Sequence, residues 1–242
     1  MSKKFAVLGD IHSNWEALSA VLEDAESQGV THYVCVGDIV GYNADPGPCL
    51  DKIMEICTVC VRGNHDHYCS HDDSLEDFHA HAAHVMKWTK SQLSEEQLEY
   101  LRNLPYEKKI AGFTLVHGTL DMPEKWGYVL GDIDAEISIE NQTTSLCFHG
   151  HTHVPVAFVK ESFVNSSSFE KLKVSIGKKY FINVGSVGQP RDRDPRASYV
   201  IYDLATRTVE LRRVEYDFRI TQQKVLAAGL PERLATRLAV GE

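Results

Sequence analysis

The first seventy residues alternate between short apolar runs and segments with helical spacing. Three apolar runs, each of strand length, lie at positions 5–8, 33–36 and 58–61. Between the first two, apolar side chains recur on one helical face: Trp15, Leu18, Val21, Leu22 and Ala25. Ser13 or Asn14 can cap this helix, and a second helix is expected near 49–56. Strands joined by helices are typical of parallel crossovers, so we predict an α/β sheet covered on both faces.

Farther along the chain, the pattern changes from helical to β. Positions 74–104 have helical spacing, interrupted near 91–94, and Pro105 ends the segment. Six later apolar runs predict strands, at 113–116, 145–148, 154–159, 180–184, 198–202 and 209–214. Helical spacing returns from Phe218 onward. Because no linker-like or repeated segment divides the sequence, we expect one domain over residues 1–242.

Composition and charge exclude some classes of partner. The net charge is -9, and no lysine- or arginine-rich run occurs, which argues against nucleic acid as the principal partner. The apolar run that precedes Gly9 has only four residues, too few for a signal-peptide core or a membrane span. We therefore expect a cytoplasmic protein without a membrane partner. The sequence does not indicate the oligomeric state.

The six cysteines lie mostly in apolar runs, which favours reduced core thiols over a disulfide framework. Cys57 and Cys60 have the spacing of a metal-binding pair. In a regular strand, however, residues three apart point to opposite faces, so we do not expect them to share a zinc ion.

Candidate chemistry lies where the predicted strands end. Five such ends carry residue types that bind metals: Asp10-Ile11-His12, Gly37-Asp38, Gly63-Asn64-His65-Asp66, His117-Gly118 and Gly150-His151-Thr152-His153. Ligands of open α/β sheets bind beyond the carboxyl ends of the strands, so these side chains are expected to meet in one two-ion site. Mixed carboxylate, amide and imidazole ligands favour manganese, with iron, zinc or nickel as alternatives, over calcium.

The ordered motifs D-x-H, G-D-x-x-G, G-N-H-D, H-G and G-H-T-H resemble those of the calcineurin-like metallophosphoesterase superfamily. The segment Asn183-Val184-Gly185-Ser186 also resembles the N-P-G-S strand end of its small bacterial phosphodiesterases, with Val184 in place of proline. The resemblance implies a four-layer α/β/β/α sandwich. It also implies an enzyme that hydrolyses phosphate mono- or diesters.

The resemblance further implies a role for each matching residue. Ligands of one ion would be Asp10, His12 and His153, and ligands of the other would be Asn64, His117 and His151. Asp38 would bridge the two ions. Asn64 and His65 would contact the substrate, and His65 would also be the general acid toward the leaving group. The phosphoprotein phosphatase branch has an aspartate that orients this histidine, but Gly41 occupies that position here, so Asp66 or a backbone carbonyl is left to orient the ring.

Two ions about 3.5–4 Å apart can activate a bridging water for in-line attack on phosphorus, which is the mechanism expected here. The expected partner is a small phosphorylated or nucleotide substrate. A generic phosphodiester, a dinucleoside polyphosphate and a serine/threonine phosphoprotein remain open as substrates. The non-enzymatic alternative is a metal-binding interaction scaffold, and a nuclease is a further alternative that the acidic charge disfavours.

Several other polar residues have both a functional and a structural interpretation. Arg191 and Arg196 lie in the Gly/Pro-rich segment 185–196 and can bind a second phosphate group, or pair with Asp192 and Asp194 to brace the loop. His149 is expected to support the ligands or simply to be buried. Tyr42 and Asn43 either shape the substrate pocket or are ordinary loop residues. A second metal site, a lid or a solvated helix face can explain the acidic and histidine cluster: His67, His71, Asp72, Asp73, His79, His81 and His84.

Overall fold

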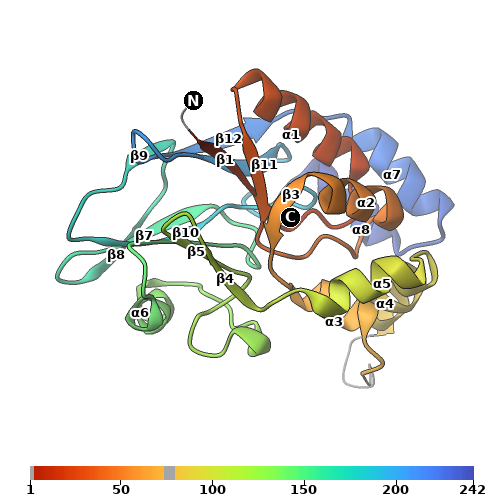
Figure 1. Ribbon diagram of the computed structural model, residues 1–242. Coiled ribbons are helices and arrows are strands. Elements are labelled where there is room, and N and C mark those ends of the chain that lie inside the picture. Colours follow the sequence, from red (N-terminus) through yellow and green to blue (C-terminus); the bar gives the residue numbers. More distant parts are fainter. Residues whose placement is uncertain (1–2, 74–79) are drawn as a thin grey trace.

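The computed structural model describes residues 3–73 and 80–242, in which two six-stranded sheets lie against each other (Figure 1). The first sheet has the strand order β3 (Cys57–Cys60), β2 (His32–Cys35), β1 (Lys4–Leu8), β11 (Ala197–Asp203), β12 (Thr208–Val214) and β9 (Lys171–Lys173). The second has the order β4 (Glu107–Ile110), β5 (Phe113–Val116), β6 (Leu146–His149), β10 (Lys179–Asn183), β7 (Val156–Lys160) and β8 (Val164–Ser167). Strands β1, β2 and β3 are parallel, and so are β5, β6 and β10.

Helices cover the outer face of each sheet. The first sheet is covered by α1 (Trp15–Ser27), α2 (Pro46–Ile56) and α7 (Phe218–Ala227), with α3 (Asn64–Ser70), α4 (Ala80–Ser91), α5 (Glu95–Asn103) and α8 (Glu232–Thr236) nearby. The second sheet is covered by α6 (Asp132–Asn141). Two short 3₁₀ turns are η1 (Pro123–Lys125) and η2 (Arg237–Ala239). The expected four-layer α/β/β/α order is therefore confirmed.

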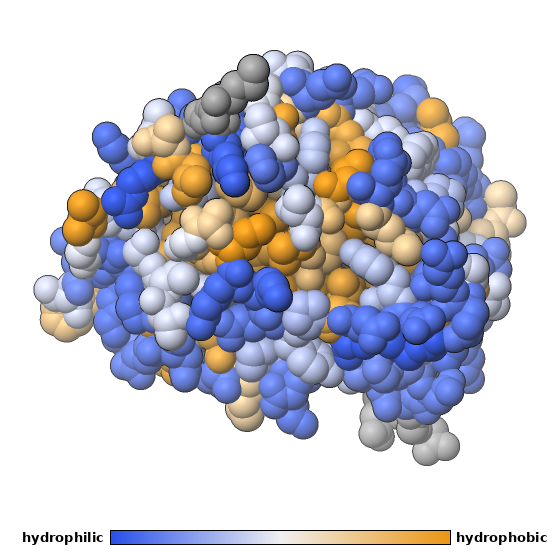
Figure 2. Space-filling model, viewed as in Figure 1, coloured by the Kyte–Doolittle hydropathy of each residue, from blue (hydrophilic) through white to orange (hydrophobic). Residues whose placement is uncertain are grey.

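Strand β1 shows why its sequence is a continuous apolar run. Phe5 and Val7 pack between the two sheets, whereas Ala6 and Leu8 pack against the helices. A strand buried on both faces has no polar side to alternate with. In the space-filling view, hydrophobic residues gather over the zone between the sheets, and hydrophilic residues surround them (Figure 2). Among the described residues, no helix combines the length and the apolar character needed to cross a bilayer.

Most predicted elements are present, and the structure adds five that were not predicted. Asn14 caps α1 by accepting from the amide of Ala17, and Ser94 caps α5 after the predicted break. Positions 74–79 of the predicted helical segment lie outside the described residues. The sequence analysis missed β4, β8, β9, α3 and α6. Strands β8 and β9 are edge strands with exposed polar residues, and α6 exposes Ile133 and Ile137, which obscures its periodicity.

The geometric argument about Cys57 and Cys60 is wrong. The pairing of β2 with β3 is irregular, because Tyr33 pairs with Cys57 and Val34 with Val59. The extra residue of this bulge lets both side chains reach the same face. Cys57 and Cys60 both pack in the core on the helix side of the first sheet, whereas Val59 packs between the two sheets. All six cysteines are free thiols, five of them buried.

Candidate metal centre

The five predicted strand ends converge at one edge of the two sheets. Five of the seven candidate ligands have left-handed backbone conformations: Asp10 (φ 51°), His12 (48°), Asp38 (53°), His151 (70°) and His153 (62°). Such conformations are costly for residues other than glycine and occur mainly where surrounding structure enforces them. Here the amide of Asp10 donates to the carbonyl of Gly37, and the amide of His12 donates to that of Asp38, each at 3.0 Å. The turns after β1 and β2 therefore hold each other.

The candidate ligands form two groups that share Asp38. In one group, Nε2 of His153 lies 3.2 Å from Oδ1 of Asp10 and 3.1 Å from Nε2 of His12. Nε2 of His12 lies 3.6 Å from Oδ2 of Asp38.

In the other group, Nε2 of His117 is central. It lies 3.3 Å from Oδ2 of Asp38, 3.2 Å from Oδ1 of Asn64 and 3.1 Å from Nδ1 of His151. The same oxygen of Asp38 thus faces both groups. All of these side chains are buried except that of Asn64, which is half-buried.

Backbone carbonyls fix the tautomers of three of the histidines. Nδ1 of His12 lies 3.1 Å from the carbonyl of Val40, and Nδ1 of His153 lies 2.6 Å from that of Gln189. Nδ1 of His117 likewise lies 2.9 Å from the carbonyl of Val36. A carbonyl only accepts, so each Nδ1 carries the proton and, in the neutral ring, each Nε2 presents a lone pair to the centre.

The facing lone pairs fit a cation. The Nε2 atoms of His12 and His153 approach to 3.1 Å with no proton to share between two neutral rings. Burial by itself disfavours a charged His117, but the carboxylates of Asp38 and Asp10 outweigh it and raise the pKa of His117 to about 9. The centre therefore attracts positive charge, and its imidazole and carboxylate donors are of the kind that hold divalent transition metals.

His65 lies next to Asp38 and is held by ring contacts. Its amide donates to Oδ1 of Asp38 at 2.8 Å. Its ring lies 4.7 Å from that of His12 and 4.3 Å from that of Tyr42, measured between centroids. Burial lowers the pKa of His65 to about 4, so its ring is neutral near pH 7. Tyr42 thus lies at the site, in agreement with the interpretation that it shapes the substrate pocket.

The suggestion that Asp66 or a backbone carbonyl orients the His65 ring is wrong. The Asp66 carboxylate accepts from the amides of Asp38, Ile39 and Gly63 at 2.8, 2.8 and 3.0 Å. Nδ1 of His65 is buried and has no hydrogen-bond partner among the described residues. The role of Asp66 in holding the loop after β2 was missed, although the G-N-H-D motif places Asp66 at the first turn of α3.

Asn43 and His149 support the loops around the centre. Asn43 is buried and donates to the carbonyl of His12 at 2.8 Å. His149 is buried and stacks on Phe181 at 4.1 Å, and Nδ2 of Asn183 lies 3.4 Å from its Nδ1. Nδ2 of Asn183 also donates to the carbonyl of Gly150 at 2.6 Å, within the turn that carries the last two histidines.

The two arginines of the 185–196 loop differ. Arg196 pairs with Asp194, with Nη2 to Oδ2 at 2.6 Å, which matches the bracing alternative. Asp192 pairs with Arg213 of β12 instead. Arg191 lies at the centre: its amide donates to the carbonyl of His153 at 3.3 Å, and its guanidinium lies 5.6 Å from the ring centroid of Tyr42.

The acidic and histidine cluster is only partly described. His67 stacks on His71 at 4.1 Å, and its Nε2 lies 2.6 Å from Oδ2 of Asp73. His84 is exposed on α4. His79 and the side chain of His81 lie outside the described residues. Within the described part of the chain, the groups suited to a metal ion all belong to the centre around Asp38.

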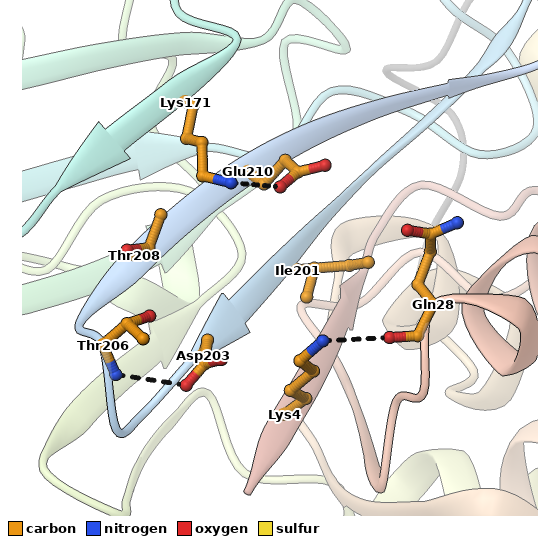
Figure 3. Close-up of a pocket in the computed structure, with 8 residues that line it drawn as sticks. All are labelled: Lys4, Gln28, Lys171, Ile201, Asp203, Thr206, Thr208 and Glu210. Carbon is orange, nitrogen blue, oxygen red and sulfur yellow. Dashed lines mark hydrogen bonds and ion pairs between the residues drawn. The ribbon is translucent and has the colours of Figure 1, made fainter. Parts of the chain in front are cut away.

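Another pocket lies near the amino end of β1, away from the strand ends that carry the ligands (Figure 3). Its charged groups are engaged locally: Nζ of Lys4 donates to the carbonyl of Gln28, and Lys171 pairs with Glu210, both at 3.1 Å. Because these charges already have partners, this pocket does not compete with the Asp38 centre as the functional site.

Comparison with known proteins identifies the family. The model of the calcineurin-like phosphoesterase superfamily domain matches residues 4–207. An uncharacterised protein of Methanocaldococcus jannaschii is 39% identical over 241 residues, which cover 98% of this chain and 97% of that protein. The chain belongs to the calcineurin-like phosphoesterase superfamily, which confirms the resemblance of its motifs.

Solved structures agree with this assignment. A metallophosphoesterase from Sphaerobacter thermophilus is 40% identical, covers 100% of both chains and superposes with a TM-score of 0.90. A hypothetical protein from Pyrococcus horikoshii shares the fold, with a TM-score of 0.81 at 22% identity over 99% of this chain and 98% of that one. Family membership and the Sphaerobacter relative support phosphoester hydrolysis as the general activity.

Proposed function

We propose that this chain hydrolyses the phosphate esters of a small phosphorylated or nucleotide substrate by means of two divalent metal ions. The observation that best supports this proposal is the position of Asp38. A single carboxylate oxygen lies 3.6 Å from Nε2 of His12 and 3.3 Å from Nε2 of His117, so it faces both groups of donors. One residue can therefore bridge two ions.

The two donor groups support a ligand set for each ion. Asp10, His12 and His153 would hold one ion, and Asn64, His117 and His151 would hold the other, with Asp38 between them. Manganese is the first choice for assays, and iron, zinc or nickel would suit the same donors. When bound, the two ions supply an activated water and neutralise charge on the phosphoryl group.

The chain's own residues position the substrate. Asn64 and His65 lie beside Asp38 and would contact the phosphoryl oxygens. A neutral His65 can donate one hydrogen bond to such an oxygen, and proton transfer to the leaving group remains a prediction for it. The carbonyls of Val36, Val40 and Gln189 hold three imidazoles in the required tautomer. Their rings need no reorientation to accept metal.

Among the alternative substrates, the surroundings of His65 weigh against a phosphoprotein. Gly41 stands where that branch carries an orienting aspartate, and a Cβ atom there would lie 2.3 Å from Nδ1 of His65. Arg191 instead favours a substrate with a further anionic group, such as a dinucleoside polyphosphate. The scaffold alternative requires metal binding without turnover.

The test compares chelator-stripped protein with and without manganese. The substrate panel is p-nitrophenyl phosphate, bis-p-nitrophenyl phosphate, a dinucleoside tetraphosphate and a phosphopeptide. We expect metal-dependent turnover, with a loss of at least about 100-fold in Asp38→Asn. Asp72→Asn is the matched control, because that side chain is 99% exposed. Stoichiometric metal binding without turnover of any substrate would favour the scaffold, and full activity in Asp38→Asn would overturn the two-ion assignment.

A further inference from the structure

A pocket of about 370 Å³ opens beside the metal centre, between the loop after β10 and the C-terminal helices. Three of its lining residues are arginines from separate segments: Arg191 from the loop, Arg233 from α8 and Arg237 from η2. Its remaining walls are mostly apolar, formed by Tyr42, Ala82, Val85, Pro231 and Leu234. A pocket of this size admits more than an isolated phosphate group.

Tyr42 and Arg191 connect this pocket to the candidate ligands. The Tyr42 ring lies 4.5 Å from that of His12 and 4.3 Å from that of His65, and the Arg191 guanidinium lies over its face. The amide of Arg191 also donates to the carbonyl of His153. A substrate held at the metal centre can therefore extend past Tyr42 into the pocket.

The three arginines give the pocket a net positive charge. Elsewhere in the chain arginines pair with carboxylates, as Arg196 does with Asp194 and Arg212 with Asp24. Within the described residues, no side-chain carboxylate forms an ion pair with any of the three arginines of the pocket. The Arg237 Nε donates to the terminal carboxylate of Glu242, which offsets part of this charge. Nη2 of Arg191 donates to Oε1 of Gln189 at 2.9 Å, and its buried Nε has no hydrogen-bond partner among the described residues.

The pKa of Arg237 reflects its burial and the positive charges nearby. Burial lowers the pKa of its guanidinium to about 10, and the nearby charges of Arg191 and Arg233 contribute to the same shift. An anion in the pocket would relieve this repulsion. Planar guanidinium groups recognise phosphate by paired hydrogen bonds, which makes a phosphoryl group the best fit.

We propose that the Arg191–Arg233–Arg237 pocket is a subsite for a second phosphoryl group of the substrate. The proposal rests on the proposed function, and it specifies the substrate class as a small molecule with a phosphoryl group beyond the one that is cleaved. Dinucleoside polyphosphates and sugar bisphosphates share this chemistry. Simple monoesters lack the second group and would leave the pocket unused.

Kinetics on matched substrates test the subsite. With manganese, we expect higher kcat/KM for a dinucleoside tetraphosphate or fructose 1,6-bisphosphate than for p-nitrophenyl phosphate. Arg237→Gln should lower kcat/KM for the preferred compound by about 10- to 100-fold, mainly through KM, and leave p-nitrophenyl phosphate within about twofold. Arg196→Gln is the control, because Asp194 already pairs with Arg196, and it should change neither. Comparing the two phosphorylated compounds distinguishes a nucleotide from a sugar substrate.

Failure of the subsite is distinguishable from failure of the proposed function. If p-nitrophenyl phosphate is hydrolysed but neither compound with additional phosphates is preferred, or Arg237→Gln affects all substrates equally, the subsite is overturned and the hydrolase stands. If nothing is hydrolysed, calorimetric titration of the chelator-stripped protein with inorganic pyrophosphate still tests the arginines. We expect weaker binding in Arg237→Gln, and equal binding by the variant and the wild type would overturn the subsite.

Discussion

A Cβ atom at Gly41 would lie 2.3 Å from Nδ1 of His65, so the His65 ring can occupy its position only because residue 41 is a glycine. The ring occupies this space against Tyr42 and His12. An aspartate at position 41 would therefore displace the His65 ring of this chain. In the phosphoprotein phosphatase branch, an aspartate at the matching position orients the corresponding histidine. The chain replaces that polar contact by packing.

Gly41→Ala is expected to lower kcat/KM by about 100-fold, because a displacement of about 1 Å at a reacting group has an effect of this size. Gly29→Ala is the matched control. Both glycines have a positive φ, 97° for Gly41 and 72° for Gly29, but a Cβ atom at Gly29 would meet nothing within 4 Å. Steady-state kinetics with manganese would measure the effect. Equal activity of the two variants would contradict the packing role of Gly41.

Asp66→Ala is expected to destabilise the fold strongly. Four buried amides would lose their acceptor, at a cost of about 1–3 kcal/mol for each amide left unsatisfied. Asp66→Asn keeps one carbonyl oxygen and should lose less. Denaturant unfolding would measure both free energies, with exposed Asp72→Ala expected to stay within about 0.5 kcal/mol of wild type. A loss of the same small size in Asp66→Ala would show that the loop after β2 does not depend on this carboxylate.

His149 should contribute to loss of stability in acid. Burial lowers its pKa from 6.5 to about 3, so below pH 6.5 the unfolded chain takes up a proton that the folded chain does not. The free energy of unfolding then falls by about 1.4 kcal/mol per pH unit from this residue. Between pH 7 and pH 5, His149→Phe should therefore lose about 2 kcal/mol less than wild type. Denaturant titrations of chelator-treated protein at both pH values would check this, and parallel pH profiles would refute it.

Removal of metal is expected to lower the unfolding temperature. Nε2 of His12 and Nε2 of His153 face each other at 3.1 Å, and a metal ion would bind both lone pairs. An ion that binds only the folded state adds about 2.7 kcal/mol at 100 times its Kd. Calorimetry with a chelator, followed by added manganese, should show a loss and then a recovery. Calcium should restore less, because it prefers oxygen ligands. If neither the chelator nor manganese changes the unfolding temperature, the result would contradict a metal centre here.

The sequence by itself determined where the candidate ligands stand along the chain. Strands that are buried on both faces, such as β1, are continuous apolar runs, and their ends are visible as the first polar residues, such as Asp10 and Asp38. Because parallel strands end at the same edge of a sheet, these polar residues could be expected to meet. The capping residues Asn14 and Ser94 also act locally, within one helical turn.

Only the tertiary structure decided which polar groups became partners. Arg191 and Arg196 lie five positions apart in one loop, yet one packs on Tyr42 and the other pairs with Asp194. Arg237 reaches the same pocket as Arg191 from a different segment, which no local spacing reveals. Side-chain periodicity records burial over a few residues. Contacts between distant segments depend on how helices and sheets pack, and that packing is a property of the whole chain.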